Sequence, residues 1–218
     1  MSRNRTPILA LVGGIGCGKS ALAAWLAEHA GARVVDADAI GHAVLQRPDI
    51  KRQLVEAFGD EVLQKDEVDR SAIARRVFGD TPAHQSARRT LESIVHPVMR
   101  GDFEEAFRSA RNSPECDLIV FDAAVLLESG WDEAVDAIAF VEVPFADRAR
   151  RVARRGWTEQ QLLQREASQW PLERKRSAAD VVIDNSGSLE AAGRQLECWL
   201  REQRLLPAAR AAAPQLTN

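Results

Sequence analysis

Near its amino end the chain contains the stretch Gly13-Gly14-Ile15-Gly16-Cys17-Gly18-Lys19-Ser20, which matches the pattern G-x-x-x-x-G-K-[ST] in full. An apolar run, 8–12, comes immediately before it, and an alanine- and leucine-rich segment, 20–30, follows. A strand, a glycine-rich loop and a helix in this order form the context in which the pattern binds phosphate. The stretch therefore predicts a phosphate-binding loop between a strand and a helix.

The chemistry of this loop follows from its residue types. Glycines let the backbone turn tightly, so that successive N–H groups point inward at the phosphates of a nucleotide, and the following helix dipole adds to the anion site. Lys19 is expected to bridge the β- and γ-phosphates, and Ser20 to ligate Mg²⁺. The dinucleotide pattern G-x-G-x-x-G fits no register here, which argues against a dehydrogenase.

Five short apolar runs are nearly continuous rather than alternating, which is typical of buried parallel strands. Helical patterns separate them, as in βαβ units. We therefore expect an α/β chain with a three-layer fold of the P-loop nucleoside-triphosphate hydrolase type: a five-stranded parallel sheet, a helical substrate-binding insertion and a lid. The expected strands are 8–12, 33–35, 117–121, 137–143 and 180–183.

The intervals between the strands are uneven. The long interval between the second and third strands shows helical patterns at 40–58, 71–78 and 86–111, which indicates a helical insertion. An arginine-rich interval, 144–176, lies between the fourth and fifth strands. A closing amphipathic helix is expected over 189–205, and the alanine- and proline-rich segment 207–218 is expected to be disordered.

Carboxylates follow two of the expected strands. Asp36 and Asp38 end the second strand, and because carboxyl ends of strands face the ligand crevice, both are expected near the phosphate loop. On an extended segment they point the same way, and Asp36 is our candidate to accept the proton of an attacking hydroxyl. The alternative is a helix cap, above all for Asp38.

Asp122 ends the third strand and is a candidate second element of a magnesium site. The alternative is a local hydrogen bond in the turn. Glu128 could face the same crevice or be solvated.

The His96-Pro97 pair interrupts a long helical pattern, and the proline is expected to push His96 toward an extended conformation. That makes His96 a candidate pocket residue, although a lone histidine is more often a packing or surface residue.

Five arginines fall in one helical stretch and indicate a mobile lid that pairs with phosphate, with Arg154 as the best single candidate. The alternatives are a solvated helix face or a nucleic-acid patch, and the second lacks interleaved aromatic residues. The five are Arg148, Arg150, Arg151, Arg154 and Arg155.

The composition excludes several classes of protein. A net charge of −3 provides no global field toward nucleic acid or an anionic membrane. Three cysteines without a C-x-x-C pair argue for reduced thiols and a cytoplasmic protein. No run of consecutive apolar residues is long enough for a membrane span, and the apolar run 8–12 is too short for a signal peptide.

Four stretches in this order resemble the dephospho-CoA kinase family, and the likeness runs from about residue 8 to about residue 200. They are LVGGIGCGKS (11–20), VVDAD (34–38), the His96-Pro97 pair and ADVVIDNSG (179–187). The segment 166–176 resembles the same family. An alternative is another P-loop small-molecule or nucleoside monophosphate kinase. A nucleotide-dependent switch is disfavoured, since the guanine-reading pattern N-K-x-D is missing from the sequence.

The resemblance implies ATP-dependent phosphorylation of the ribose 3′-hydroxyl of dephospho-CoA, the last step of coenzyme A biosynthesis, with ATP and Mg²⁺ as cofactors. The partners expected are small molecules, with no nucleic acid and no membrane, and the protein is expected to be a cytoplasmic monomer. It implies one kinase domain over 1–206, in three parts. These are a core (about 7–38, 116–144 and 178–206), a CoA-binding insertion (about 39–115) and a lid (about 145–177).

The resemblance also implies the roles of single residues. Asp36 is the expected base, with Lys19 and Arg154 as further catalytic residues. Ser20 is expected to hold Mg²⁺ with water. The acceptor is expected to contact Asp36, His96 and Asp122. ATP is expected to contact Gly14, Ile15, Gly16, Cys17, Gly18, Lys19, Ser20 and Ala21.

Four positions depart from the family pattern. Cys17 replaces a usual serine and Ala21 a usual threonine, at places where backbone groups carry the contacts. His42 stands where arginine is common, and Ala124 where proline is usual. None of these changes removes a group that the chemistry requires.

Overall fold

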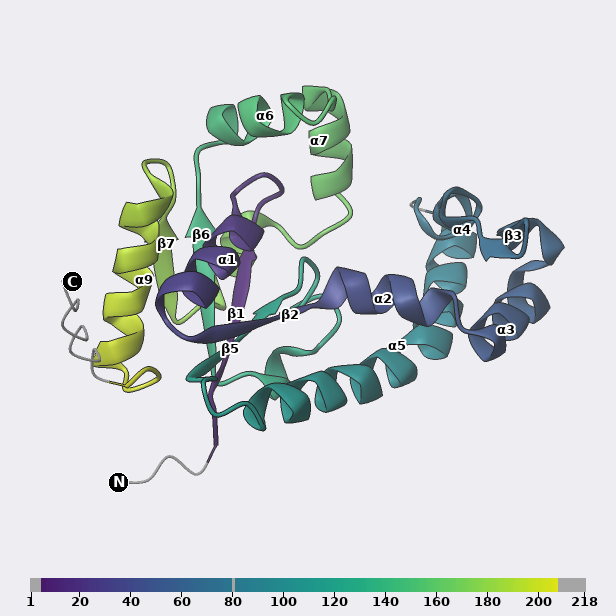
Figure 1. The fold of residues 1–218 in the computed structure, drawn as a ribbon. Coiled ribbons are helices and arrows are strands. Elements are labelled where there is room, and N and C mark those ends of the chain that lie inside the picture. Colours follow the sequence, from purple (N-terminus) through teal and green to yellow (C-terminus); the bar gives the residue numbers. More distant parts are fainter. Residues whose placement is uncertain (1–4, 80, 208–218) are drawn as a thin grey trace, which may run out of the picture. The chain divides into compact units, whose positions relative to one another are not determined.

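The protein is described by a computed structural model that covers residues 5–79 and 81–207. Contacts within the chain group it into two compact units. One unit consists of Met1–Val34 and Ala110–Asn218, and the other of Val35–Ser109. Figure 1 shows the path of the chain. Apart from Pro207, the segment expected to be disordered lies outside the described residues.

Five strands form one sheet in the order β2-β5-β1-β6-β7. The pairs β1–β5, β1–β6 and β6–β7 are parallel. The five-stranded parallel sheet expected from the sequence is therefore confirmed, and β1 lies at its centre. The strands are β1 (Ile8–Gly13), β2 (Ala32–Asp36), β5 (Leu118–Asp122), β6 (Ala137–Glu142) and β7 (Val181–Asp184).

Two long helices, α1 (Lys19–His29) and α9 (Leu189–Glu202), pack against each other. Their contact is close because Gly193 of α9 has no side chain: a Cβ atom there would lie 2.3 Å from Cδ2 of Trp25 in α1. The indole Nε1 of Trp25 donates a hydrogen bond of 2.8 Å to Glu190. The two helices thus depend on a fitted contact between a large ring and a glycine.

Three helices fill the arginine-rich interval after β6, namely α6 (Phe145–Ala153), α7 (Glu159–Glu166) and α8 (Leu172–Ser177). A capping box starts α7: the Thr158 hydroxyl accepts from the N–H of Gln161 at 3.2 Å, and the Gln161 side chain accepts from the N–H of Thr158 at 2.9 Å. Figure 1 shows α6 and α7 as an angled pair in this interval.

Both faces of the central strand β1 are covered. Leu9 and Leu11 belong to the apolar cluster that includes residues of α1 and α9. Ile8, Ala10 and Val12 point to the opposite face, because side chains alternate along a strand, and they are buried as well. The short helix α8 contacts β1. Burial on both faces explains why the strand reads as a continuous apolar run.

The unit Val35–Ser109 is mostly helical and has its own apolar core. Its elements are α2 (Ala37–Leu45), α3 (Pro48–Phe58), the 3₁₀ turn η1 (Asp60–Val62), α4 (Arg70–Val77) and most of α5 (Pro82–Arg111). The core residues are Val44, Ile50, Leu54, Phe58, Val62, Val68, Ile73, Val77 and Val95.

A small hairpin in this unit was not expected from the sequence. Strands β3 (Leu63–Gln64) and β4 (Glu67–Val68) pair antiparallel around Lys65 and Asp66, whose φ angles are 52° and 64°. Two-residue strands are too short to show the period-2 alternation that identifies a strand in a sequence. A second short element, the 3₁₀ turn η2 (Asp132–Ala134), lies between β5 and β6.

Two prolines had opposite effects on the helices. The single helix expected over 40–58 is divided before Pro48, because a residue that precedes proline avoids helical geometry, and Arg47 is extended (ψ 137°). Pro97 does not divide α5. The prediction that it makes His96 extended is wrong, because apolar neighbours such as Val95 hold this part of the helix in the core.

Within residues 5–79 and 81–207, none of the helices combines the length and the apolar character that crossing a bilayer requires.

Replacing Gly193 with Ala is expected to lower the free energy of unfolding by about 1–3 kcal/mol, because the new methyl group meets the Trp25 ring. Helix propensity alone predicts the opposite sign. The control is Gly101→Ala in α5, where a Cβ atom meets nothing within 4 Å and stabilisation by about 0.5–1 kcal/mol is expected. Urea unfolding of both variants measures this, and a stabilised Gly193→Ala variant would contradict the fitted contact.

Candidate active site

The phosphate loop connects β1 to α1 through a backbone that requires glycine. Gly16 (φ 81°) and Gly18 (φ 93°) lie in the left-handed region, where a side chain is strained. Gly18 directly precedes α1, and the first turn of this helix carries no acidic side chain. The first N–H groups of α1 are therefore free of a competing carboxylate in their own turn, and the helix dipole favours an anion there.

The ammonium group of Lys19 lies over the loop that precedes it. Its Nζ donates to the carbonyl of Gly13 at 3.2 Å and to that of Gly14 at 3.4 Å. The side chain thus bends back from the start of α1 and places its positive charge at the loop. The predicted contact of Lys19 with the β- and γ-phosphates stays a prediction.

Ser20 and Asp122 meet beside the loop. The Ser20 hydroxyl donates to Oδ2 of Asp122 at 2.6 Å. Sheet order explains the encounter: β5 pairs with β1, and Asp122 lies opposite Leu11. Two hard oxygen ligands at one edge of the sheet suit Mg²⁺.

In the described part of the chain, no three His, Cys, Asp or Glu side chains gather into a site that could hold a metal unaided. Mg²⁺ in phosphoryl-transfer sites is typically held by one or two protein oxygens together with substrate phosphates and waters. The pair of Ser20 and Asp122 is a donor set of that kind.

Asn185, to which we assigned no role from the sequence, and Arg151, one of the five arginines of the predicted lid, hold the loop from outside. Asn185, which follows β7 and is 4% exposed, donates through Nδ2 to the carbonyl of Cys17 at 2.8 Å. Arg151 of α6 donates to the same carbonyl at 3.2 Å and to the carbonyl of Asn185 at 2.8 Å. Asn185 belongs to the stretch ADVVIDNSG that carried the family resemblance, but nothing in that stretch indicated a contact with the phosphate loop.

The arginine cluster of the lid is divided between loop and solvent. Arg148 and Arg151 contact the loop. Arg150 pairs with Asp147 on its own helix, and Arg154 and Arg155 are exposed. The role predicted for Arg154 stays a prediction.

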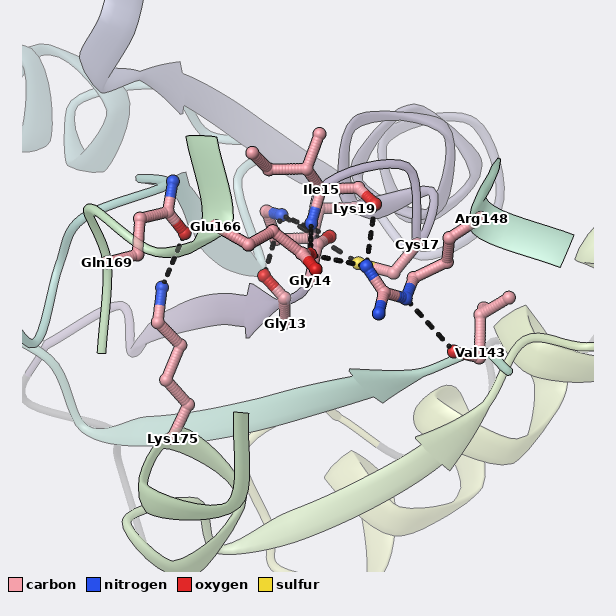
Figure 2. Close-up of polar contacts among 10 residues, drawn as sticks. All are labelled: Gly13, Gly14, Ile15, Cys17, Lys19, Val143, Arg148, Glu166, Gln169 and Lys175. Carbon is pink, nitrogen blue, oxygen red and sulfur yellow. Dashed lines mark hydrogen bonds and ion pairs between the residues drawn. The ribbon is translucent and has the colours of Figure 1, made fainter. Parts of the chain in front are cut away.

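Arg148 and Glu166 form a buried ion pair against the loop, as Figure 2 shows. Oε1 of Glu166, the last residue of α7, accepts from the N–H of Ile15 at 2.9 Å and pairs with Nη1 of Arg148. The same Nη1 donates to the carbonyl of Ile15 at 3.2 Å, and Nε donates to the carbonyl of Val143 at 3.2 Å. Sequence reasoning could not find Glu166, because an acid at the end of a helix has no distinctive pattern.

A second buried ion pair anchors the segment after α7. Lys175, 1% exposed, contacts Glu128 at 2.8 Å and Gln169 at 2.9 Å, the second contact being drawn in Figure 2. Glu128 also accepts from the N–H of Trp170 at 2.8 Å. Glu128 therefore anchors the segment that contains Gln169. It is not solvated, which was one of the two alternatives left by the sequence, and its facing the crevice stays a prediction. A buried pair of this kind needs both partners.

In the unit Val35–Ser109, Asp36 is the N-cap of α2. Its Oδ1 accepts from the N–H of Ala39 at 2.9 Å. The cap that we considered mainly for Asp38 is thus made by Asp36. Asp38 lies in the first turn of α2, so the expectation that both carboxylates share an extended segment is wrong: the helix begins at Ala37.

His96 is half-buried in α5. Burial lowers its pKa below the ordinary value of 6.5, and Arg100 lowers it further, whereas Glu92 opposes the shift. The neutral imidazole is therefore favoured in the folded protein.

A family model for dephospho-CoA kinase matches residues 7–191. The chain belongs to the dephospho-CoA kinase family. Similar members include the dephospho-CoA kinase of Deinococcus radiodurans, 41% identical over 197 residues, with 89% of this chain and 91% of that protein covered. The dephospho-CoA kinase of Enterococcus faecalis is 34% identical, with 91% and 98% covered. The resemblance stated from four stretches of sequence is therefore confirmed.

Solved structures share the fold of this chain. The protein TT1252 of Thermus thermophilus superimposes with a TM-score of 0.76 at 33% identity, covering 91% of this chain and 98% of that one. The dephospho-CoA kinase of Campylobacter jejuni gives a TM-score of 0.61 at 21% identity, covering 90% and 96%, and shares the fold. The chain thus has the fold expected of a dephospho-CoA kinase, an ATP-dependent kinase.

Replacing Asn185 with Ala is expected to lower the free energy of unfolding by about 1–3 kcal/mol, because the Cys17 carbonyl loses a buried donor. ADP binding should weaken by about tenfold, since the loop loses a hydrogen bond that holds its shape. Urea unfolding and calorimetry measure the two effects. The matched control is Gln164→Ala, which removes an exposed amide from α7. An Asn185→Ala variant that binds ADP like the wild type would show that nucleotide binding does not need the hydrogen bond between Asn185 and the Cys17 carbonyl.

The lowered pKa of His96 has a consequence for stability. As the pH falls from about 6.5 toward the lower pKa of the folded state, the unfolded chain takes up a proton that the folded chain refuses. Wild type should therefore lose stability relative to His96→Gln over this window, and the difference should be constant above it. Histidine NMR titration and urea unfolding at several pH values test this. A His96 pKa at or above 6.5 would refute it.

Proposed function

We propose that the chain transfers the γ-phosphoryl group of ATP to the ribose 3′-hydroxyl of dephospho-CoA, giving CoA and ADP. Family membership supports this acceptor. The observation that carries the phosphoryl-transfer half is the phosphate loop with Lys19 over it and the Ser20–Asp122 pair, 2.6 Å apart, beside it. The reaction is the last step of coenzyme A biosynthesis.

Positioning and charge stabilisation are the main tasks of a phosphoryl transferase. We assign the ATP phosphates to the loop and the start of α1, from Gly14 to Ala21, whose N–H groups supply donors without reorganisation. Lys19 stabilises the charge that develops on the transferring group. Its present partners, the carbonyls of Gly13 and Gly14, keep the ammonium at the loop before nucleotide binds.

Mg²⁺ is assigned to the Ser20 hydroxyl, through water in part, with Asp122 as the second oxygen of the site. When bound, Mg²⁺ neutralises charge on the β- and γ-phosphates. The hydrogen bond between Ser20 and Asp122 supports this assignment, because it keeps both oxygens together. Asp122 is also assigned to the acceptor side, as expected from the sequence.

Asp36 is assigned as the base that takes the proton of the 3′-hydroxyl. Its Oδ1 caps α2, and we assign Oδ2 as the proton acceptor. The cap fixes the rotamer of the side chain, which favours a defined approach of the hydroxyl. His96 is assigned to the acceptor site, and the lowered pKa favours a neutral imidazole that can both donate and accept hydrogen bonds.

The three parts of the domain are assigned in the same way. The core is about 7–38, 116–144 and 178–206, the CoA-binding insertion about 39–115, and the lid about 145–177 with Arg154 among its phosphate-pairing residues. A separate apolar cluster within Val35–Ser109 supports an insertion with its own core. We further propose that the protein acts in the cytoplasm as a monomer. The free thiols of its three cysteines support the cytoplasm, and light scattering tests the monomer.

The reaction is tested by ADP release from ATP and Mg²⁺ with one acceptor at a time: dephospho-CoA, adenosine, AMP or shikimate. Strong stimulation by dephospho-CoA alone, with CoA as the product, is expected. Stimulation by another acceptor would retain the kinase and reject this substrate. Omission of Mg²⁺ from the same assay tests the metal, and full activity without any divalent cation would reject it.

Asp36→Asn is expected to lower kcat by about 10²–10⁴-fold with ADP affinity nearly unchanged. Asparagine is also a good N-cap, so α2 keeps its start and only the basicity of the group is lost. Asp38→Asn is the matched control in the same turn, and it should retain most of the activity. Loss of turnover in Asp38→Asn with normal turnover in Asp36→Asn would move the role of base to Asp38.

A further inference from the structure

The ion pair of Arg148 and Glu166 brings a negative charge onto the phosphate loop. Oε1 of Glu166 lies 2.9 Å from the N–H of Ile15, which is the third residue of the loop pattern. That N–H belongs to a series of backbone donors whose chemistry favours phosphate. A carboxylate is negatively charged, as a phosphate group is. Glu166 therefore occupies a place that suits a nucleotide phosphate.

Arg148 is held at the loop independently of Glu166. Its Nη1 and Nε donate to the carbonyls of Ile15 and Val143, each at 3.2 Å, and the residue is 4% exposed. A guanidinium has five N–H donors, so two carbonyl bonds leave donors for an anion. A buried guanidinium without a counter-charge is costly. Glu166 supplies that counter-charge in the structure (Figure 2).

One side of the ion pair borders a crevice, which Arg148 lines and Glu166 does not. Arg148 and Gly14 both line a crevice of about 470 Å³. The pair approaches the loop so closely that a Cβ atom at Gly14 would lie 2.7 Å from Nη1 of Arg148 and 3.0 Å from Oε1 of Glu166. Glu166 is the last residue of α7, so its side chain can leave the loop while the rest of that helix stays formed.

We propose that the Glu166 carboxylate is a built-in occupant of the phosphate loop, which nucleotide phosphate displaces from Ile15 and Arg148. Before the nucleotide binds, Glu166 satisfies the Ile15 N–H and the Arg148 charge. When phosphate binds, Arg148 exchanges the carboxylate for a phosphate oxygen. Its buried positive charge therefore keeps a negatively charged partner. The inference rests on the proposed function for the identity of the nucleotide. It makes Glu166 a residue that weakens nucleotide binding and Arg148 one that strengthens it.

The test measures binding of ADP and of inorganic tripolyphosphate to the full chain by calorimetry. Tripolyphosphate has neither a base nor an acceptor, so it reports on the phosphate site alone. Glu166→Gln keeps the size of the side chain and a carbonyl oxygen for the Ile15 N–H, and removes only the charge. We expect about tenfold tighter binding of both ligands, within the usual range for coupled sites. Lys19→Ala, which should abolish tripolyphosphate binding, verifies that the loop is the site.

Matched variants separate displacement from a purely structural ion pair. Glu159→Gln removes an exposed charge at the other end of α7 and should leave both affinities unchanged. Arg148→Gln should weaken both ligands by about tenfold. Unchanged or weaker tripolyphosphate binding in a folded Glu166→Gln variant would overturn the proposal and leave the pair a structural contact.

A second variant covers the case in which Glu166→Gln does not fold. Glu166→Asp keeps the charge and withdraws the carboxylate from the loop by one methylene, so tripolyphosphate should bind more tightly than to the wild type. Equal or weaker binding would overturn the displacement. None of these measurements uses an acceptor. Failure of dephospho-CoA to stimulate ADP release would reject the proposed function and leave the displacement intact.

Discussion

A glycine-rich loop that exposes its N–H groups to an anion has few side chains with which to hold its own shape. The loop of this chain is therefore held from outside by side chains that bond its carbonyls and do not occupy its N–H donors. Asn185 and Arg151 bond the Cys17 carbonyl, and Arg148 bonds the Ile15 carbonyl. These residues follow β6 and β7, so the form of the phosphate site depends on the sheet placing β6 beside β1 and β7 beside β6.

The same constraint explains the distribution of charge. Lys19, Arg148 and Arg151 all donate to loop carbonyls, so that positive charge is present at the site before any ligand arrives. Such a preorganised arrangement stabilises developing negative charge without reorganisation during the reaction. The concentrated positive charge must also be compensated when the site lacks a nucleotide. The ion pair with Glu166 provides the balance for Arg148, the most deeply buried of these cations.

Local sequence patterns predicted the strands well, because burial of apolar side chains dominates there. Doubly buried strands produced continuous apolar runs, and all five strands were found at the expected places. Prediction failed where packing competes with local preference. Pro97 remains inside α5 because its neighbours belong to an apolar core. The carboxylate that caps α2 is Asp36, because this helix begins at Ala37, earlier than the pattern starting at residue 40 indicated. The β3–β4 hairpin escaped notice because two-residue strands show no period.

The sequence by itself determined the phosphate loop, the five strands and the family, because glycine spacing, residue type and apolar runs act over a few neighbouring positions. The tertiary structure alone decided which of five similar arginines reach the loop, and that Asn185 and Glu166 meet it. These contacts join residues more than a hundred positions apart. They follow from the order of β1, β6 and β7 and from the packing of α6 and α7, which no short stretch of sequence encodes.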